Sequence, residues 1–387
     1  MTLTAGIASP AENRPVQGGV VSRAAALRQW MSANQYVAVL ALLVVMFVVF
    51  AITQTRFFTV ANIRVLLTSV AILWMVSLGL TVVMLTGGFD LSLAAMVGLS
   101  GFIFVGFFST FGIPAIPAIV LTILAGALIG GAVNGLLIGG LGVPFLVVTI
   151  GTLSVFEGTT YLVSGTQTIS VTSGVLNSIG FNSAAGVPIT VWIMIGTLLV
   201  AYFVLRRTYF GRDVYAVGGN AAAARLSGVR VTRTLVLAYA ISGGMAALGG
   251  VLEVSRISAA SPTIGNTIIF SATAAVLIGG TVLGGGIGGI VGTVVGVLFL
   301  GVLQNGLALS GLASSWQEVV SGAIVVLAVL FHQFQHKGYP LLRRRRPDGG
   351  DGLLAGPAVA GGVGGAGDAA AERPGDRPPD VQATKSS

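Results

Sequence analysis

The sequence predicts an all-α protein, a polytopic membrane bundle of about ten transmembrane helices, and three observations support this prediction. Hydrophobic residues make up 54% of the 387 residues and charged residues only 8%, whereas a soluble domain carries about 25% charged residues. Apolar runs such as 92–111 match the roughly 20 residues that a helix needs to cross about 30 Å of hydrocarbon. These runs lack the alternation of polar and apolar residues that marks membrane β-strands. Helices are therefore expected, since only helices and closed barrels satisfy their backbone groups in lipid.

Ten candidate spans follow one another along the chain. The eighth is the least regular, because it leads into the glycine-rich stretch Gly279-Gly-Thr-Val-Leu-Gly-Gly-Gly286, and it is expected either to span the membrane or to re-enter it. In chain order the spans are 36–52, 63–85, 91–111, 115–138, 144–163, 187–205, 234–252, 267–284, 288–309 and 317–335.

Lysine and arginine flank the spans unevenly, which predicts their orientation. Fourteen lie before span one, between spans six and seven or directly after span ten, where Lys337 and the run 343–346 are counted, against Arg56, Arg64 and Arg256 on the other side. Both termini are thus expected in the cytoplasm. Three regions follow: a cytoplasmic tail over 1–35, a transmembrane domain over 36–335 with a cytoplasmic loop at 206–233, and a tail over 336–387. That last tail is first basic and then rich in glycine and proline, so it is expected to be disordered.

Several kinds of chemistry are not expected. The chain has no cysteine, which excludes disulfides and thiolate chemistry. His332 and His336 are spaced like metal ligands, but beside a membrane interface we predict neither a metal site nor catalytic residues. Neither Lys337 nor Lys385 completes the Gly-x-x-x-x-Gly-Lys-Ser/Thr phosphate-binding loop, so the chain is expected to bind no nucleotide cofactor itself. The net charge of +8 flanks the spans, which favours contact with membrane lipid over nucleic acid.

The loop at 206–233 carries a specific local structure. Gly218, Gly219 and Asn220 form a turn signal, and Asn220 is a good N-cap for a short helix from Ala221 to Leu226 that Gly228 would end. One interpretation is a solvated basic connector that only sets the topology. The capped geometry favours the other, a docking element on the cytoplasmic face.

This loop resembles the cytoplasmic coupling loop of ribose-type permeases, the membrane subunits of bacterial ATP-binding-cassette importers for sugars. Other stretches are similar to the same family in the same order, between about 37 and 329. They are Thr86-Gly-Gly-Phe-Asp-Leu-Ser92, Pro144-Phe-Leu-Val-Val-Thr-Ile-Gly-Thr152, Ser242-Gly-Gly-Met-Ala-Ala-Leu-Gly-Gly250, Ala274-Ala-Val-Leu-Ile-Gly-Gly280 and Asn305-Gly-Leu307.

The resemblance implies a permease of the bacterial inner membrane, present as a homodimer or a heterodimer. It also implies two separate ATPase subunits that use ATP and Mg²⁺, and a periplasmic or lipid-anchored binding protein that delivers a small polar solute. The residues that would dock into the ATPase are Gly211, Arg212, Gly218, Gly219, Asn220, Ala224, Arg225 and Gly228.

Six residues within the spans are candidates for a solute path. A charge at mid-bilayer costs about 3 kcal/mol or more, so Asp90 and Glu157 need a partner or a polar cavity. Each candidate also has a structural interpretation: Asp90 as a helix cap, Glu157 and the two amides as polar clamps between helices, and the aromatic ring as an interfacial anchor. The six are Asp90, Ser92, Asn134, Phe145, Glu157 and Asn305.

One stretch departs from the family pattern. Where ribose-type permeases usually have an aromatic residue and an acidic pair, this chain has Ile268-Ile-Phe-Ser271. Permeases for nucleosides or another polar solute therefore stay open as alternatives, with branched-chain amino acid permeases as a more distant relation. An ion-coupled secondary transporter that uses Asp90 or Glu157 is the alternative from a different class.

Overall fold

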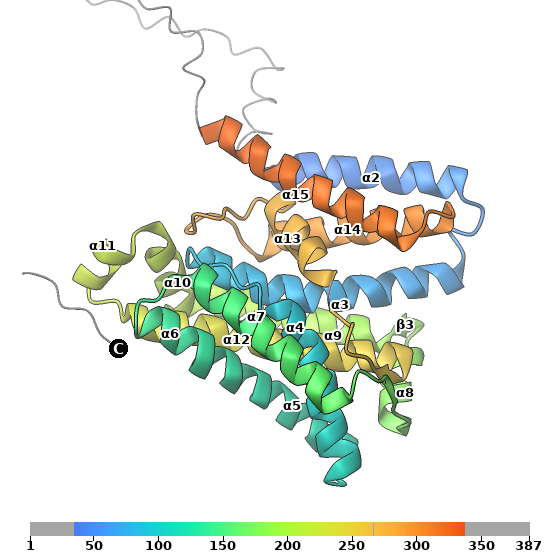
Figure 1. Ribbon diagram of the computed structural model, residues 1–387. Helices are drawn as coiled ribbons and strands as arrows, with labels where there is room; N and C mark the ends of the chain where they lie inside the picture. The colour runs from blue at the N-terminus through green and yellow to red at the C-terminus, as the bar shows by residue number, and fades with distance from the viewer. Residues whose placement is uncertain (1–34, 266, 337–387) are drawn as a thin grey trace, which may run out of the picture. The chain divides into compact units, whose positions relative to one another are not determined.

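The computed structural model describes residues 35–265 and 267–336, which fold almost entirely into helices (Figure 1). The tails predicted as cytoplasmic or disordered fall, apart from Gln35 and His336, outside the described residues. The helices are α2 (Gln35–Thr53), α3 (Val60–Leu85), α4 (Leu93–Val105), α5 (Ala115–Ile129), α6 (Leu136–Gly139), α7 (Phe145–Ser164), α8 (Gly174–Phe181), α9 (Ile189–Arg207), α10 (Tyr209–Gly219), α11 (Ala221–Leu226), α12 (Val231–Ile257), α13 (Ile268–Ile278), α14 (Ile290–Leu309) and α15 (Ser314–His336). Two π-helical turns, η1 (Gly106–Thr110) and η2 (Gly130–Gly135), continue α4 and join α5 to α6.

The fold class predicted from the sequence is confirmed. Within the described residues, seven helices are long and apolar enough to cross a membrane. Three shorter apolar helices, Val39–Thr53, Ile268–Ile278 and Ser314–Leu330, lie at the first, eighth and tenth predicted spans. Each predicted span therefore overlaps an apolar helix, although the eighth does so over only part of its length.

The centre of the bundle is formed by α3, α4 and α12, whose side chains are largely buried by the other helices. The most apolar part of α3 is 83% buried inside the protein, whereas that of α9 is only 17% buried. The outward side chains of α5, α7 and α9 are nevertheless apolar, as Leu128, Leu162 and Leu199 illustrate. A helix that is apolar on all sides is typical of a core or a membrane span, so the outer faces of these helices are suited to lipid or to another membrane helix.

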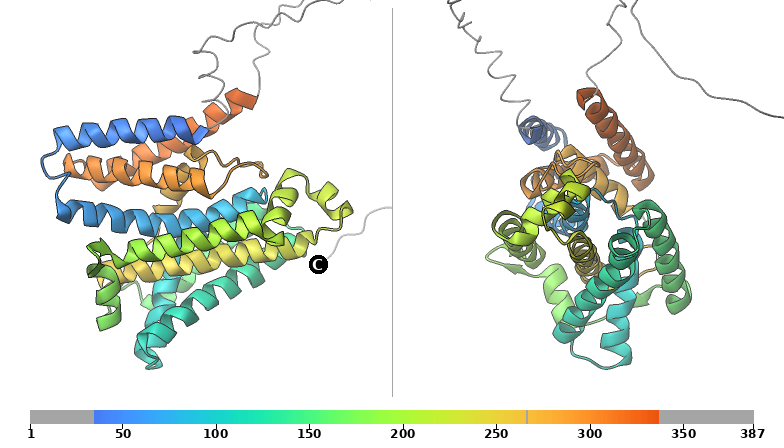
Figure 2. Two further views of the ribbon diagram at one scale, coloured as in Figure 1. Left: turned by 180° about the vertical axis from the view of Figure 1, so that it is seen from behind. Right: turned by 90° about the vertical axis from the view of Figure 1, so that its left-hand side faces the viewer.

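The bundle has two distinct ends (Figures 1 and 2). One, here the α11 end, carries α10 and α11. The other, the α8 end, carries α8 and two small antiparallel pairs of strands: β2 (Ser183–Ala184) with β3 (Val187–Pro188), and β1 (Ile169–Ser170) with β4 (Ala259–Ala260). Because β1 follows α7 and β4 follows α12, the β1–β4 pair ties distant parts of the chain together, whereas β2 and β3 form a local hairpin.

Glycines let α5 and η2 lie directly against α12. A Cβ atom on Gly126 would lie 2.6 Å from the Cβ of Ala247, and one on Gly135 would lie 2.7 Å from the Cα of Val236. Both distances are too short for real side chains, so only glycine permits this approach, as in other close-packed membrane helices. The glycines of the fourth predicted span therefore form a packing surface.

The segment 258–289, here the broken segment, passes from the α8 end to the α11 end without a full-length helix. At one end Ala260 pairs with Ile169, and at the other the Gly286 amide donates to the Leu85 carbonyl at 3.0 Å. Between them α13 has only 11 residues, or about 16 Å of helix. The predicted eighth span at 267–284 is thus helical over only part of its length, and it crosses the bundle rather than re-entering it.

Candidate functional site

The loop between α9 and α12 folds as predicted around Asn220. The Asn220 side-chain oxygen accepts a hydrogen bond from the Ala223 amide at 2.9 Å, and α11 runs from Ala221 to Leu226. Gly228 follows with a φ of +86°, a left-handed conformation that suits glycine. The capped helix expected from the sequence is therefore present.

The preceding helix α10 was not predicted, because its three glycines are typical of a loop. Gly211 lies where a Cβ would collide with the Leu205 carbonyl, so its lack of a side chain lets α10 fold back onto α9. The buried spacing of Val214 and Val217 is the sequence signal that could have revealed α10. The guanidinium of Arg212 lies 4.3 Å from the centre of the Tyr209 ring.

The docking residues predicted on α11 divide into buried and exposed ones. Ala224 is buried against Val217 and Val231, so it fixes α11 to the bundle. Arg225 is exposed, and the neighbouring Leu226, which the sequence did not single out, is 91% exposed. Arginine is enriched at protein interfaces, so Arg225 and the adjacent exposed Leu226 are available to a protein partner.

Three backbone segments meet at the α11 end through glycines. We call this contact of Gly87, Gly218, Gly285 and Gly286 the glycine junction. A Cβ on Gly218 would collide with the Leu85 carbonyl and lie 2.5 Å from the Gly286 nitrogen. A Cβ on Gly285 would lie 2.6 Å from the Gly87 nitrogen. The junction therefore joins α10 to the turn after α3 and to the broken segment by direct backbone contact.

Tyr215 adds a side-chain bond to this contact. Its hydroxyl donates to the Gly288 carbonyl at 3.1 Å. Burial raises the pKa of the Tyr215 hydroxyl, and the charge of Arg206 opposes the rise only in part. The hydroxyl is thus protonated at neutral pH and remains a donor.

Three predicted path residues, Asp90, Ser92 and Asn134, come together in one buried polar cluster with Ser242. One Asp90 oxygen accepts from the Ser92 amide at 3.1 Å and from the Ser92 hydroxyl, and the other accepts from Ser242 at 2.9 Å. The Asn134 amide donates to Ser92 at 2.8 Å. Ser92, and not Asp90, is the N-cap residue of α4, so the predicted cap is wrong. Asp90 instead joins the turn before α4 to α12 through Ser242, while Asn134 joins that turn to η2 through Ser92.

The other three predicted residues lie apart from this cluster and from one another. Asn305 exchanges two hydrogen bonds of 2.9 Å with Asn62, which clamps α14 to α3. Phe145 is the first residue of α7 and is half-buried. Glu157 is also half-buried on α7, and no hydrogen bond within the described part of the chain holds its carboxylate.

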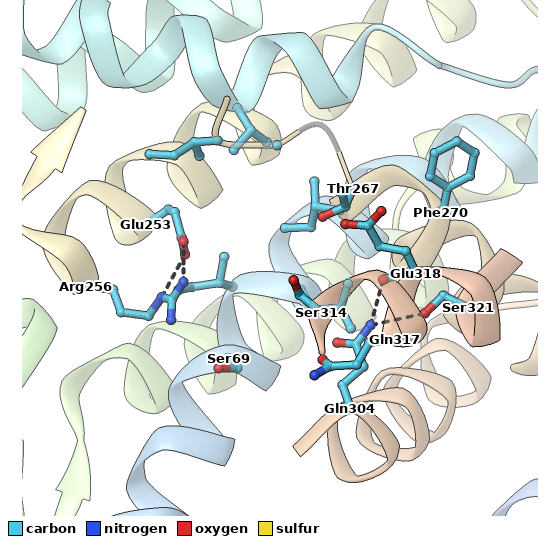
Figure 3. Close-up of a pocket in the computed structure, with 17 residues that line it drawn as sticks. Ser69, Glu253, Arg256, Thr267, Phe270, Gln304, Ser314, Gln317, Glu318 and Ser321 are labelled. Carbon is cyan, nitrogen blue, oxygen red and sulfur yellow. Dashed lines mark hydrogen bonds and ion pairs between the residues drawn. The ribbon is translucent and has the colours of Figure 1, made fainter. Parts of the chain in front are cut away.

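A polar pocket of about 280 Å³ lies between the broken segment, the end of α12, and α14 and α15 (Figure 3). Two larger hollows, of about 720 and 540 Å³, are lined almost wholly by apolar side chains. The polar groups of the pocket are Ser69, Glu253, Arg256, Thr267, Ser271, Gln304, Ser314, Gln317, Glu318 and Ser321.

Two side-chain groups organise the pocket. The Gln304 amide donates to the Ser271 hydroxyl at 2.8 Å and to the Ser321 hydroxyl at 3.3 Å. Across the pocket Arg256 forms an ion pair with Glu253, with one bond of 3.0 Å from its Nε. Sequence reasoning singled out Asn305 and missed Gln304, its neighbour, because which of two adjacent amides faces a pocket depends on helices far away in the sequence.

The chain is similar to a known protein family and to several named permeases. Residues 62–329 match the family described as branched-chain amino acid transport system / permease component. The ribose import permease protein of Escherichia coli (strain K12) is 36% identical over 297 residues, which cover 74% of this chain and 91% of that protein. No solved structure matches.

Two further relatives import other solutes. The autoinducer 2 import system permease protein of Yersinia enterocolitica is 36% identical over 324 residues, which cover 80% of this chain and 96% of the relative. The fructose import permease protein of Rhizobium meliloti is 36% identical over 290 residues, which cover 73% and 80%. The resemblance to ribose-type permeases is thereby confirmed. Because the family match runs from α3 to α15 and includes both the glycine junction and the polar pocket, this chain belongs to the family of branched-chain amino acid transport system permease components.

Proposed function

We propose that the chain is the permease subunit of an ATP-binding-cassette importer that carries a small neutral solute of the sugar class across the bacterial inner membrane. The relatives named as ribose, fructose and autoinducer 2 import permeases support this class of function. The observation that carries the proposal is the capped helix α11, which exposes Leu226 and is joined through α10 and the glycine junction to the broken segment.

The partners follow from this arrangement. Separate ATPase subunits would bind at the α11 end and supply the energy of ATP hydrolysis, since the chain carries no phosphate-binding loop of its own. A second permease, identical or related, would complete the membrane part, with two ATPases below it. A solute-binding protein, periplasmic or lipid-anchored, would deliver solute at the α8 end.

Alternating access would result from rigid-body movement of α10 and α11. A short helix seated in a partner can transmit such a movement to the segments it contacts. Here those segments are the turn after α3 and the broken segment, and the broken segment lines the polar pocket. Movement driven by the ATPase would therefore reach the pocket wall along one continuous stretch of chain.

The buried cluster at Asp90 favours this proposal over an ion-coupled transporter. Both carboxylate oxygens already accept hydrogen bonds from serines that belong to the helix packing. A coupling carboxylate must exchange its ion with both sides of the membrane, which a group sealed at 2% exposure does not favour. Asp90 is better explained as a packing group.

The docking role of α11 is tested with a Leu226→Glu variant and a matched Phe181→Glu control. Phe181 is also an exposed apolar side chain, 62% exposed, but it lies on α8 at the opposite end. A charge at an interface hot spot costs about 2 kcal/mol or more. We expect Leu226→Glu to lower the ATP hydrolysis that copurifies with the tagged chain, and ATP-dependent sugar uptake, by about tenfold or more.

The control variant should retain the copurifying ATP hydrolysis, and both variants should reach the membrane in normal amounts. Full copurifying ATP hydrolysis and full uptake in Leu226→Glu would contradict the docking role of α11. Uptake that persists without ATP but stops with the proton gradient would contradict the importer as a whole.

A further inference from the structure

The polar pocket lies in the half of the bundle that is away from the α11 end. Glu253 and Arg256 stand in the last two turns of α12, just before β4 at the α8 end. Ser321 lies in the second turn of α15, which begins at the same end, and Ser271 lies in the first turn of α13. The pocket is therefore placed to meet a solute that arrives from the α8 end.

Gln304 and its two serine partners present unused hydrogen-bonding groups to this pocket. The serine hydroxyls accept from the Gln304 amide, and within the described residues neither hydroxyl hydrogen has an acceptor. The Gln304 side-chain oxygen also has no partner in the described part of the chain. Ser271 and Ser321 are 8% and 3% exposed, so helix packing holds the set in place. It offers one acceptor and two donors side by side.

This combination matches the chemistry of a sugar hydroxyl. Each hydroxyl group both donates and accepts, so neighbouring hydroxyls can donate to the Gln304 oxygen and accept from the two serines. Such neutral bonds contribute only about 0.5–1.5 kcal/mol each. A weak site of this kind suits transit, because a conduit must release what it binds.

The opposite wall disfavours a charged solute. Arg256 is 41% exposed and keeps N–H groups for a hydroxyl oxygen, but its charge is already balanced by Glu253, which is 16% exposed. Glu318 at the exposed rim adds a negative charge. The pocket thus has no surplus positive charge for a carboxylate or a phosphate.

We infer that Gln304, Ser271 and Ser321 form a solute-contacting station that recognises hydroxyl groups of a neutral monosaccharide on its way through the permease. The inference rests on the proposed import function and assigns specificity to residues of the permease itself. Figure 3 shows Gln304 and Ser321 on one side of the pocket and the Arg256–Glu253 pair on the other.

The test measures ATP-dependent uptake of D-ribose and its monodeoxy analogues by the complete importer in membrane vesicles, with the same binding protein throughout. A site built to bond a hydroxyl discriminates against the analogue that lacks it. We expect Gln304→Ala to reduce the preference for ribose over at least one deoxy analogue by about threefold to tenfold, the worth of one hydrogen bond. Gln54→Ala, which deletes the same amide at the exposed end of α2, should leave the preference unchanged.

The outcomes separate the station from the import function. If Gln304→Ala lowers uptake of all sugars by one common factor, Gln304 only supports the packing of α13 and α15, and the station is overturned. If the wild type imports L-leucine in an ATP-dependent way and no sugar, the chain is an importer subunit, but the solute-contacting station does not recognise sugar hydroxyls. If the wild type shows no ATP-dependent uptake of either kind, the proposed function itself fails.

Discussion

Gly218 occupies the tightest position of the glycine junction. A Cβ on Gly218 would collide with the Leu85 carbonyl, whereas one on Gly219 would meet no atom within 4 Å. We therefore expect Gly218→Ala to force α10 away from the broken segment at a cost of about 1–3 kcal/mol. The prediction is a loss of ATP-dependent uptake with normal amounts of the chain in the membrane, measured in vesicles.

Gly196→Ala on α9, where an added Cβ also meets no atom within 4 Å, is the control and should keep both the junction and the uptake. If the two alanine variants transport equally well, direct contact at Gly218 does not transmit movement. A loss of membrane insertion in Gly218→Ala alone would show that the junction serves folding rather than coupling.

At the residue scale, the sequence identified polar groups more reliably than their surroundings. Asp90, Ser92 and Asn134 could be recognised as polar residues in apolar spans, and the structure brings these three together. Ser242, the partner of Asp90, lies more than 100 residues further along the chain, so the cluster could not be assembled from local patterns. The roles predicted for all six path residues stay predictions.

Among the elements, the contact between α12 and the α5–η2 segment depends most on small residues. A Cβ on Gly130 would collide with the Tyr239 carbonyl and lie 3.2 Å from the Cα of Gly243. We expect Gly130→Ala to lower the free energy of unfolding in detergent by about 1–3 kcal/mol, since overpacking displaces one helix from the other. Thermal unfolding of the purified chain measures this effect as a lower midpoint.

The matched control is Gly196→Ala on α9, where an added Cβ would meet no atom within 4 Å. Alanine is the better helix former by about 1 kcal/mol, so this variant should unfold at the wild-type temperature or slightly above it. Equal unfolding midpoints for Gly130→Ala and the wild type would show that the α5–α12 contact tolerates a side chain.

The helices predicted from the sequence were wrong where the local sequence pattern and the tertiary contacts disagree. The long spans were found because length and apolarity alone define a lipid-facing helix. Helix α10 was missed because Gly211 and Gly218, which weaken a helix, are required by the close approach of Leu205 and Leu85. The predicted eighth span was too long for its helix, because hydropathy does not distinguish a helix from apolar backbone that is buried by its neighbours.

For the molecule as a whole, the absence of cysteine makes the predicted orientation directly measurable. Single cysteines can be placed at Leu226, which is 91% exposed at the α11 end, and at Phe181 at the α8 end. We expect a membrane-impermeant thiol reagent to label Phe181→Cys in intact cells and Leu226→Cys only after the membrane is opened. The reason is the concentration of Lys and Arg around α10 and α11, which favours the cytoplasmic side.

The wild-type chain, which carries no thiol, is the blank for this measurement. Labelling of Leu226→Cys from outside would reverse the orientation and with it the side on which an ATPase binds. Labelling of both sites in intact cells would mean that the chain inserts in two orientations.

The glycine junction bears on how permeases of this family can acquire different ATPase partners. Its contacts are made by main-chain atoms, and these are the same in every residue, so the junction carries no information about which partner is bound. The identity of the partner must instead be encoded by the outward side chains of α11, such as Arg225 and Leu226. Partner recognition and the transmission of movement are thus carried by different atoms. The outward side chains of α11 are free to change with a new ATPase, while the backbone contact at the glycine junction stays the same.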